Sequence, residues 1–150
     1  MKVFLDTNVL VSAVATRGLC ADLFQAILTD HDLVVGETVL TELRRILRNK
    51  LRAPPETVEE MDLFLRREAV VVGDAPALDI VIRDAADAVV LAEAVAAEVD
   101  VLVTGDRDLL EIATTAPVRI LNPRGFWEEL RSDDTIKVVG GSGPARPISS

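Results

Sequence analysis

Short runs of β-branched and aliphatic residues alternate with longer stretches of helical period along this chain. The runs predict strands over residues 2–6, 33–35, 70–72, 101–104 and 118–121. The intervening stretches predict helices over residues 8–15, 20–30, 37–51, 56–68, 85–98 and 109–113, with a last helix containing residues 126–130. This alternation is typical of α/β domains, so we expect an α/β fold with a central, mainly parallel, five-stranded sheet.

The length of 150 residues suits one domain with a sizeable core, and the 49% hydrophobic fraction excludes a disordered chain. The C-terminal segment differs, because it is rich in Gly, Ser and Pro and has no helical or alternating period. We therefore expect a domain over residues 1–131 and a flexible tail over residues 132–150.

No apolar run approaches the roughly 18 residues that a membrane span needs, since Glu93, Glu98 and Asp100 interrupt the longest candidates. The N-terminus is a poor match to a signal peptide, because Asp6 and Asn8 fall inside what would be its apolar core. We expect the N-terminus to be retained, the protein to be cytoplasmic, and no membrane partner.

Cysteine and histidine chemistry is almost excluded. Cys20 is the single cysteine, so neither an internal disulfide nor a Cys-based metal site is possible. His31 is the single histidine and lies in a polar stretch typical of a solvated turn. Zinc sites built from several histidines are excluded as well.

The formal net charge of -9 argues against binding of nucleic acid over the whole surface. A local basic run nevertheless follows Glu42 within about one helical turn. It consists of Arg44, Arg45, Arg48, Lys50 and Arg52. Two interpretations remain open for this run: a solvated helix face, or contacts with substrate phosphates.

Acidic residues lie at or just after the ends of two predicted strands. Asp6 ends the first strand, and Asp106 and Asp108 follow the fourth. Open parallel sheets bind ligands outside the carboxyl ends of their strands, so these acids can converge on one crevice. Asp87 in the first turn of the helix over 85–98, and Glu42 at the edge of a buried helical stripe, are further candidates.

Each acid also has a structural interpretation. Asp6, Asp106 or Asp108 could cap a following helix, and Asp84 with Asp87 has the spacing of a capping box. Glu42 could be a surface acid. Together, however, clustered carboxylates repel one another by roughly 4 kcal/mol per pair at about 4 Å and an effective dielectric near 20. Such a cluster needs protonation or a cation.

Carboxylates without histidine or cysteine form a hard-oxygen site, which suits Mg²⁺ or Mn²⁺. A metal ion held this way beside phosphate oxygens can activate a water and stabilise the leaving oxygen of an in-line displacement. The acids therefore point to phosphodiester hydrolysis.

Four stretches of the chain resemble a PIN domain, most closely the VapC-like branch of toxins from toxin–antitoxin pairs. They are VFLDTNVLVSA, VVGETVLTELRRIL, RDAADAVVLAEAVAAEVDVLVTGDRDLL and VRILNPRGFWEEL, and they lie in the family's order within residues 1–131. The resemblance implies a three-layer α/β/α fold and RNA cleavage that depends on one or two Mg²⁺ or Mn²⁺ ions. It also implies a small cognate antitoxin and a homodimer.

The resemblance also assigns site residues. The family's catalytic and metal-binding acids match Asp6, Glu42, Asp87 and Asp106. Auxiliary roles fall to Asn8 and Thr104, which would orient water or carboxylates, and to Asp84 and Asp108. The position of the basic run close to Glu42, rather than the resemblance, gives the expectation that Arg44, Arg45 and Arg48 bind RNA. The chain departs from many relatives in having Ala85 and Ala88 where a proline and a second acid are common.

The sequence leaves two alternatives to a metal-dependent ribonuclease. One is a PIN fold that has lost cleavage and only binds a partner, although all four matched acids are present. The other is a phosphatase of the HAD type, which also begins with an Asp after the first strand. That class needs a second acid two residues later, where Asn8 stands, and a flexible glycine that this stretch lacks.

Overall fold

A five-stranded parallel sheet forms the centre of the computed structural model, which describes the backbone of residues 1–140 and the side chains of residues 1–132. The strand order is β3-β2-β1-β4-β5, and every neighbouring pair is parallel. The strands are β1 (Lys2–Leu5), β2 (Asp32–Gly36), β3 (Val70–Val72), β4 (Val101–Val103) and β5 (Arg119–Leu121). The α/β class and the parallel sheet predicted from the alternating pattern are confirmed.

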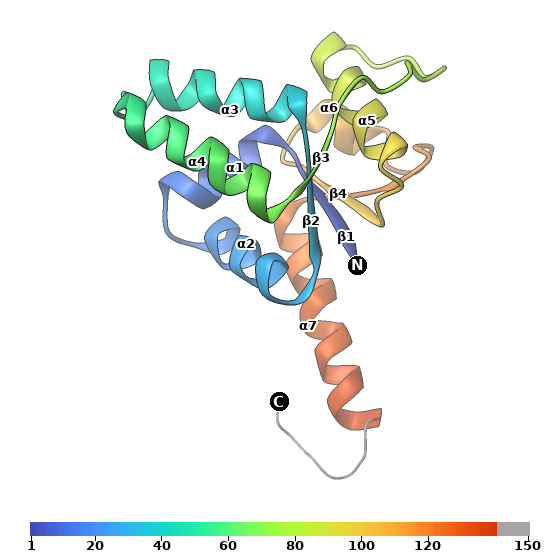
Figure 1. Ribbon diagram of the computed structural model, residues 1–150. Helices are drawn as coiled ribbons and strands as arrows, with labels where there is room; N and C mark the ends of the chain where they lie inside the picture. Colours follow the sequence, from blue (N-terminus) through green and yellow to red (C-terminus); the bar gives the residue numbers. More distant parts are fainter. Residues whose placement is uncertain (141–150) are drawn as a thin grey trace.

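Helices cover both faces of this sheet. Figure 1 shows α1 and α2 on one side of the strands and α5 and α6 on the other, which confirms the three-layer arrangement. The helices are α1 (Thr7–Ala15), α2 (Leu19–Asp30), α3 (Glu37–Asn49), α4 (Pro55–Glu68), α5 (Ala85–Ala96), α6 (Arg107–Glu111) and α7 (Pro123–Gly140). Because both faces are covered, the inner strands are apolar after the charged first residues of β1 and β2, rather than alternating.

The register of the two central strands determines what meets at the edge of the sheet. Leu5 of β1 pairs with Val103 of β4, so both strands end at the same level. The residues that follow these two strands, Asp6 and Thr104, therefore lie side by side. Backbone hydrogen bonds continue past the strands, from Asp6 N to Val103 O at 3.0 Å and from Thr104 N to Leu121 O at 3.0 Å.

The C-terminal helix is longer than expected. We predicted a tail from residue 132, whereas α7 continues to Gly140, so the backbone of residues 132–140 is helical. The reason is visible in the sequence, because no Gly or Pro occurs between Arg131 and Val139 and the helix-breaking residues begin only at Gly140. Residues 141–150 lie outside the described part, and the division at residue 131 stays a prediction.

Within residues 1–140, no single helix is long and apolar enough to cross a membrane. Only α1 and α2 taken together meet the criteria of length and composition, and their axes are bent by 100°. Both helices contribute buried residues to the core, among them Leu10, Leu23 and Ile27.

Candidate functional site

A cavity of about 260 Å³ opens at the carboxyl ends of the central strands. Its walls come from the end of β1, from α3, from the start of α5 and from the segment after β4. Five carboxylates line it, and we call it the acid pocket: Asp6, Glu42, Asp84, Asp87 and Asp106. The structure thus brings together all four acids that were predicted to be catalytic, from positions a hundred residues apart in the chain.

Asp6 is both a helix cap and a wall of the acid pocket. Its Oδ1 accepts a hydrogen bond from Thr7 N at 2.7 Å, at the N-cap of α1, and its Oδ2 accepts one from Thr104 Oγ1 at 2.7 Å. The residue is only 5% exposed. Burial raises the pKa of Asp6, the two hydrogen bonds lower it, and the charges of Asp106 and Glu42 raise it further. The two interpretations of Asp6 are therefore compatible.

Thr104 and Asn8 join the ends of β1 and β4. Thr104 is fully buried, and its hydroxyl donates to Asp6 and accepts from Asp106 N at 2.9 Å. Asn8 Oδ1 accepts a hydrogen bond from Gly105 N at 2.9 Å. Thr104 thus orients one carboxylate directly and holds the backbone that carries the next.

Within the described part of the chain, Asp87, Asp106 and Asp108 form a close group of three acids. Each offers a carboxylate oxygen, and these oxygens lie within 4.8 Å of one another. Asp108 N also donates to Asp106 Oδ1 at 2.8 Å, where Asp106 caps α6. Asp87 is buried, and its Oδ2 has no hydrogen-bond partner. The structure therefore contains a buried carboxylate oxygen, facing other acids, that the protein leaves unsatisfied.

Burial raises the pKa of Asp87 to about 7, and the charges of Asp106, Asp84 and Asp6 act in the same direction. Desolvation is the largest cause of this shift, and the repulsion expected for clustered carboxylates adds to it. Near neutral pH, the cluster must therefore retain a proton or acquire a cation.

Asp84 has a structural role that the sequence left open. It is the N-cap of α5, where its Oδ1 accepts hydrogen bonds from Ala86 N at 2.8 Å and from Asp87 N at 3.4 Å. Through the second of these bonds, Asp84 fixes the backbone that carries the Asp87 side chain. Asp84 therefore caps α5 and lines the acid pocket at the same time.

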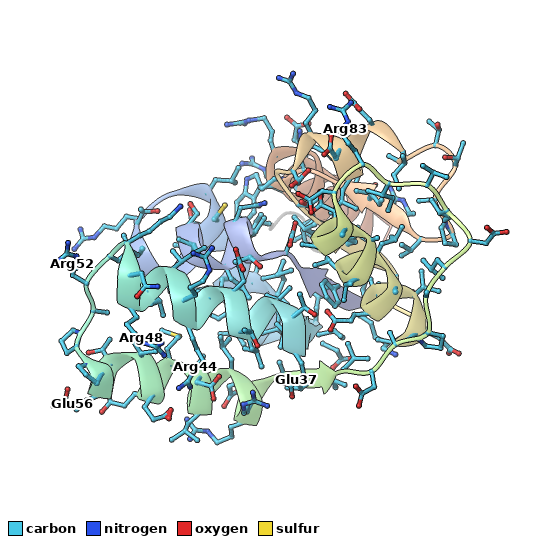
Figure 2. All side chains as sticks on the ribbon, turned by 90° about the horizontal axis from the view of Figure 1, so that it is seen from above. Glu37, Arg44, Arg48, Arg52, Glu56 and Arg83 are labelled. Atoms are coloured by element: carbon cyan, nitrogen blue, oxygen red, sulfur yellow. The ribbon has the colours of Figure 1, made fainter. Side chains whose placement is uncertain are left out.

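The three arginines expected to bind RNA lie on two sides of α3. Arg45 pairs with Glu42 at 2.7 Å beside the acid pocket. Arg44 turns toward α4, where it lies 2.9 Å from Glu59 and 3.4 Å from Asp62. Arg48 is one turn after Arg44, and Figure 2 shows both on the α4 side of α3. Arg45 is thus the one of the three whose ion pair is with a residue that lines the acid pocket, Glu42.

Two further residues at the site were not singled out from the sequence. Thr38 lines the acid pocket, and its position one helical turn before Glu42 was the available signal. Arg83 directly precedes Asp84, and Figure 2 shows it on the opposite side of the molecule from Arg48 and Arg52. Arg83 therefore places a positive charge next to an acid-pocket residue on the side away from the basic run of α3.

The acid pocket fits a divalent cation by the chemistry of its donors. Its potential ligands are carboxylate oxygens, which Mg²⁺ and Mn²⁺ prefer. The unpartnered Oδ2 of Asp87 supplies a free acceptor inside the cluster. A bound cation would also remove the repulsion that raises the pKa of Asp87.

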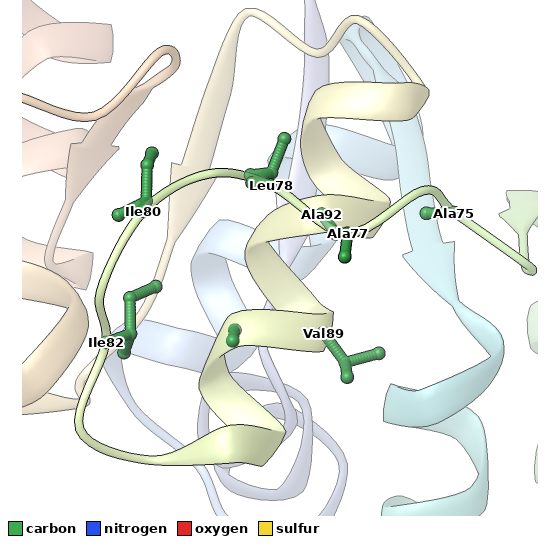
Figure 3. A pocket seen from close by; sticks show the side chains of 8 residues that line it. Ala75, Ala77, Leu78, Ile80, Ile82, Val89 and Ala92 are labelled. Atoms are coloured by element: carbon green, nitrogen blue, oxygen red, sulfur yellow. The ribbon is translucent and has the colours of Figure 1, made fainter.

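A second cavity, of about 150 Å³, lies between α5 and the segment that precedes it (Figure 3). Its lining is entirely apolar and includes Leu78, Ile80, Ile82 and Val89. None of its lining side chains can ligate a metal or transfer a proton.

Comparison with known proteins agrees with this architecture. A family model described as PIN domain matches residues 2–108. Among solved structures, VapBC2 from Rickettsia felis bound to a promoter DNA fragment is similar, with 18% identity, a TM-score of 0.58, and coverage of 81% of this chain and 98% of that chain. No curated protein sequence matches significantly.

Two further structures show the same likeness. VapBC-1 from nontypeable Haemophilus influenzae has 15% identity and a TM-score of 0.59, covering 83% of this chain and 99% of that chain. FitAcB from Neisseria gonorrhoeae has 18% identity and a TM-score of 0.55, covering 81% and 98%. At these identities the structures establish a shared fold, while the family model matches most of the sequence itself. The chain belongs to the PIN domain family.

Proposed function

We propose that this protein is an endoribonuclease that hydrolyses RNA phosphodiester bonds with Mg²⁺ or Mn²⁺. The observation that carries the proposal is the acid pocket, in which Asp6, Asp87 and Asp106 converge and Asp87 Oδ2 is buried without a partner. Membership of the PIN domain family supports nuclease activity as the class of reaction.

In this proposal Asp6, Glu42, Asp87 and Asp106 would hold one or two metal ions. A bound ion would supply an activated water and charge stabilisation at the scissile phosphate. The chain's own part is to orient the acids. Thr104 fixes the Asp6 carboxylate through its hydroxyl, which also supports the backbone of Asp106.

Substrate binding would involve few cations, because the net charge is -9. Arg45 forms an ion pair with Glu42, which lines the acid pocket, and would be the member of the basic run that contacts a phosphate. Asn8 and Gly105 would keep the loop after β4 in place through their hydrogen bond.

We further propose that the protein is the cytoplasmic toxin of a toxin–antitoxin pair, with a small antitoxin as partner and a homodimeric assembly. The sequence resemblance to VapC-like toxins supports this role. This chain is similar in fold to chains of the VapBC and FitAcB structures, and the similarity covers almost their whole length. That similarity is consistent with a toxin role.

The phosphatase alternative loses support from the geometry of Asn8. A phosphatase of that type needs an acid at this position to transfer a proton, whereas the Asn8 side chain accepts a hydrogen bond from Gly105 N. The non-catalytic alternative loses support from the convergence of all four acids on one cavity.

A cleavage assay tests the proposed function. Wild-type protein is expected to cut single-stranded RNA in Mn²⁺ and to stop in EDTA. Asp6→Asn is expected to lose more than about 100-fold in rate, because even outer-shell changes cost about 10- to 100-fold at metal sites. Glu60→Gln, the same change of charge at an exposed position of α4, is the matched control. Undiminished cleavage by Asp6→Asn would contradict the assignment.

A further inference from the structure

Helix α3 begins without a cap of its own. Its N-cap residue is Gly36, which has no side chain to bond the free N–H groups of the first turn. The missing acceptor comes from α5 instead. Glu93 Oε2 accepts hydrogen bonds from Thr38 N at 3.2 Å and from Thr38 Oγ1 at 3.0 Å. A carboxylate on one helix thus caps another helix that lies far from it in sequence.

Glu93 is an unusual residue for its location. It is 2% exposed, lies between the buried residues Ala92 and Ala94, and its Oε1 has no hydrogen-bond partner. Burial raises the pKa of Glu93, the bonds from Thr38 lower it, and the charge of Glu37 raises it. A buried carboxylate with one unsatisfied oxygen is unfavourable for stability alone, since an apolar residue would fill the space without that penalty.

Gly36, at the end of β2, also lies close to the Glu93 carboxylate. A Cβ atom at Gly36 would lie 1.9 Å from Glu93 Oε1, so only glycine fits there while Glu93 keeps its position. Three elements, β2, α3 and α5, therefore meet at one side chain. We call the contact between Glu93 and Thr38 the α3–α5 clamp.

The clamp adjoins the acid pocket. Thr38 lines that pocket, Glu42 lies one turn further along α3, and Asp87 lies on α5, the helix that carries Glu93. We propose that Glu93 is a positioning residue, which holds α3 against α5 and so sets the separation of the Glu42 and Asp87 carboxylates. This inference rests on the proposed function, because it assigns the clamp a role in metal binding.

Amide hydrogen exchange and Mn²⁺ titration test the inference on folded protein. In Glu93→Ala, the Thr38 amide loses its acceptor and is expected to exchange faster by NMR, and the affinity for Mn²⁺ is expected to fall about 10- to 100-fold by calorimetry. Glu93→Gln keeps an acceptor oxygen for Thr38, so its Mn²⁺ affinity is expected to stay within a few-fold of wild type.

Two other variants separate positioning from stability. Leu65→Ala removes a fully buried side chain from α4 and is expected to lower the melting temperature while leaving Mn²⁺ affinity unchanged. Gly36→Ala displaces the Glu93 carboxylate without altering it, and is expected to reproduce both effects of Glu93→Ala. If Glu93→Ala does not fold, Thr38→Val removes only the hydroxyl bond and is expected to weaken Mn²⁺ binding in the same direction.

The outcomes distinguish the two proposals. Equal Mn²⁺ affinities of wild type and of folded Glu93→Ala would overturn the positioning role, as would a loss of affinity in Leu65→Ala equal to that in Glu93→Ala. Failure of the wild-type protein to bind Mn²⁺ would overturn the proposed function and the metal-binding role of the clamp. In that case Thr38 amide exchange still shows whether the clamp forms.

Discussion

At the scale of single residues, the site depends on side chains that serve the fold and the chemistry together. The Asp6 carboxylate caps α1 through one oxygen and meets Thr104 through the other. Thr104 in turn holds the backbone of Asp106. The same hydroxyl supports two acids of the acid pocket. Removing it should therefore disturb the orientation of both carboxylates without removing a charge.

Replacing Thr104 tests this role. Thr104→Val removes the hydroxyl and leaves Asp6 Oδ2 and Asp106 N without their partner, so we expect a loss of about 1–3 kcal/mol in the free energy of unfolding. We also expect Mn²⁺ affinity to fall about 10- to 100-fold, as for other second-layer groups at metal sites. Thr104→Ser keeps the hydroxyl and serves as the control. Denaturant unfolding and calorimetry measure the two quantities, and equal Mn²⁺ affinities would contradict the role.

The sequence predicted part of the candidate site, for a physical reason. Asp6 and Asp106 follow strands, and the ends of parallel strands meet at one edge of the sheet. Glu93 was not predicted to matter, because in the sequence it reads only as an acid that interrupts an apolar helix. Its partner Thr38 is more than fifty residues away, and only the packing of α5 against α3 brings the two together.

At the scale of elements, α3 presents two different faces. Arg45 and Glu42 lie on the face toward the acid pocket, whereas Arg44 is paired with Glu59 and Asp62 of α4. The arginines of the basic run therefore have different partners within one helix. Sequence spacing could not predict these partners, because the contacts with α4 depend on how the two helices pack.

Substitutions on the two faces of α3 are expected to have different effects on RNA binding and stability. In an Asp6→Asn background that prevents cleavage, Arg45→Ala is expected to weaken RNA binding and to reduce the slope of log affinity against log salt by about 0.7, the value for one phosphate contact with a single strand. Arg44→Ala is expected to leave that slope unchanged and to lower stability, because Asp62 is buried and loses a partner. Fluorescence anisotropy over a salt series measures the slope. Equal reductions in both variants would contradict the assignment.

At the scale of the whole molecule, the fold class was predictable because short apolar runs, typical of buried strands, alternate with stretches of helical period. The order β3-β2-β1-β4-β5 was not predicted, since it depends on where each helical crossover returns the chain. Helix α7 continues to Gly140, into the segment where we expected a tail, because no Gly or Pro occurs between Arg131 and Val139.

The stability of the whole molecule should depend on pH through the acid pocket. Folding raises the pKa of Asp87 from 3.8 to about 7, so between these values the folded state binds more protons than the unfolded state. Without metal, the free energy of unfolding is therefore expected to fall as pH rises from about 4 through about 7. The raised pKa of Asp6 acts in the same direction.

Mn²⁺ is expected to oppose that decline, because it binds the ionised acids of the folded protein. Thermal melts with and without Mn²⁺ should give a larger Mn²⁺-induced increase in Tm at pH 8 than at pH 5.5. Asp87→Asn removes the main titrating group and is expected to flatten the metal-free profile. An identical Mn²⁺-induced increase at both pH values would contradict this linkage.

The central claim is that the acids at the carboxyl edge of the sheet form a divalent metal site, and anomalous diffraction from crystals soaked in Mn²⁺ tests it most directly. We expect an anomalous peak in the acid pocket between Asp6, Asp87 and Asp106. The absence of a peak there at millimolar Mn²⁺ would contradict the claim.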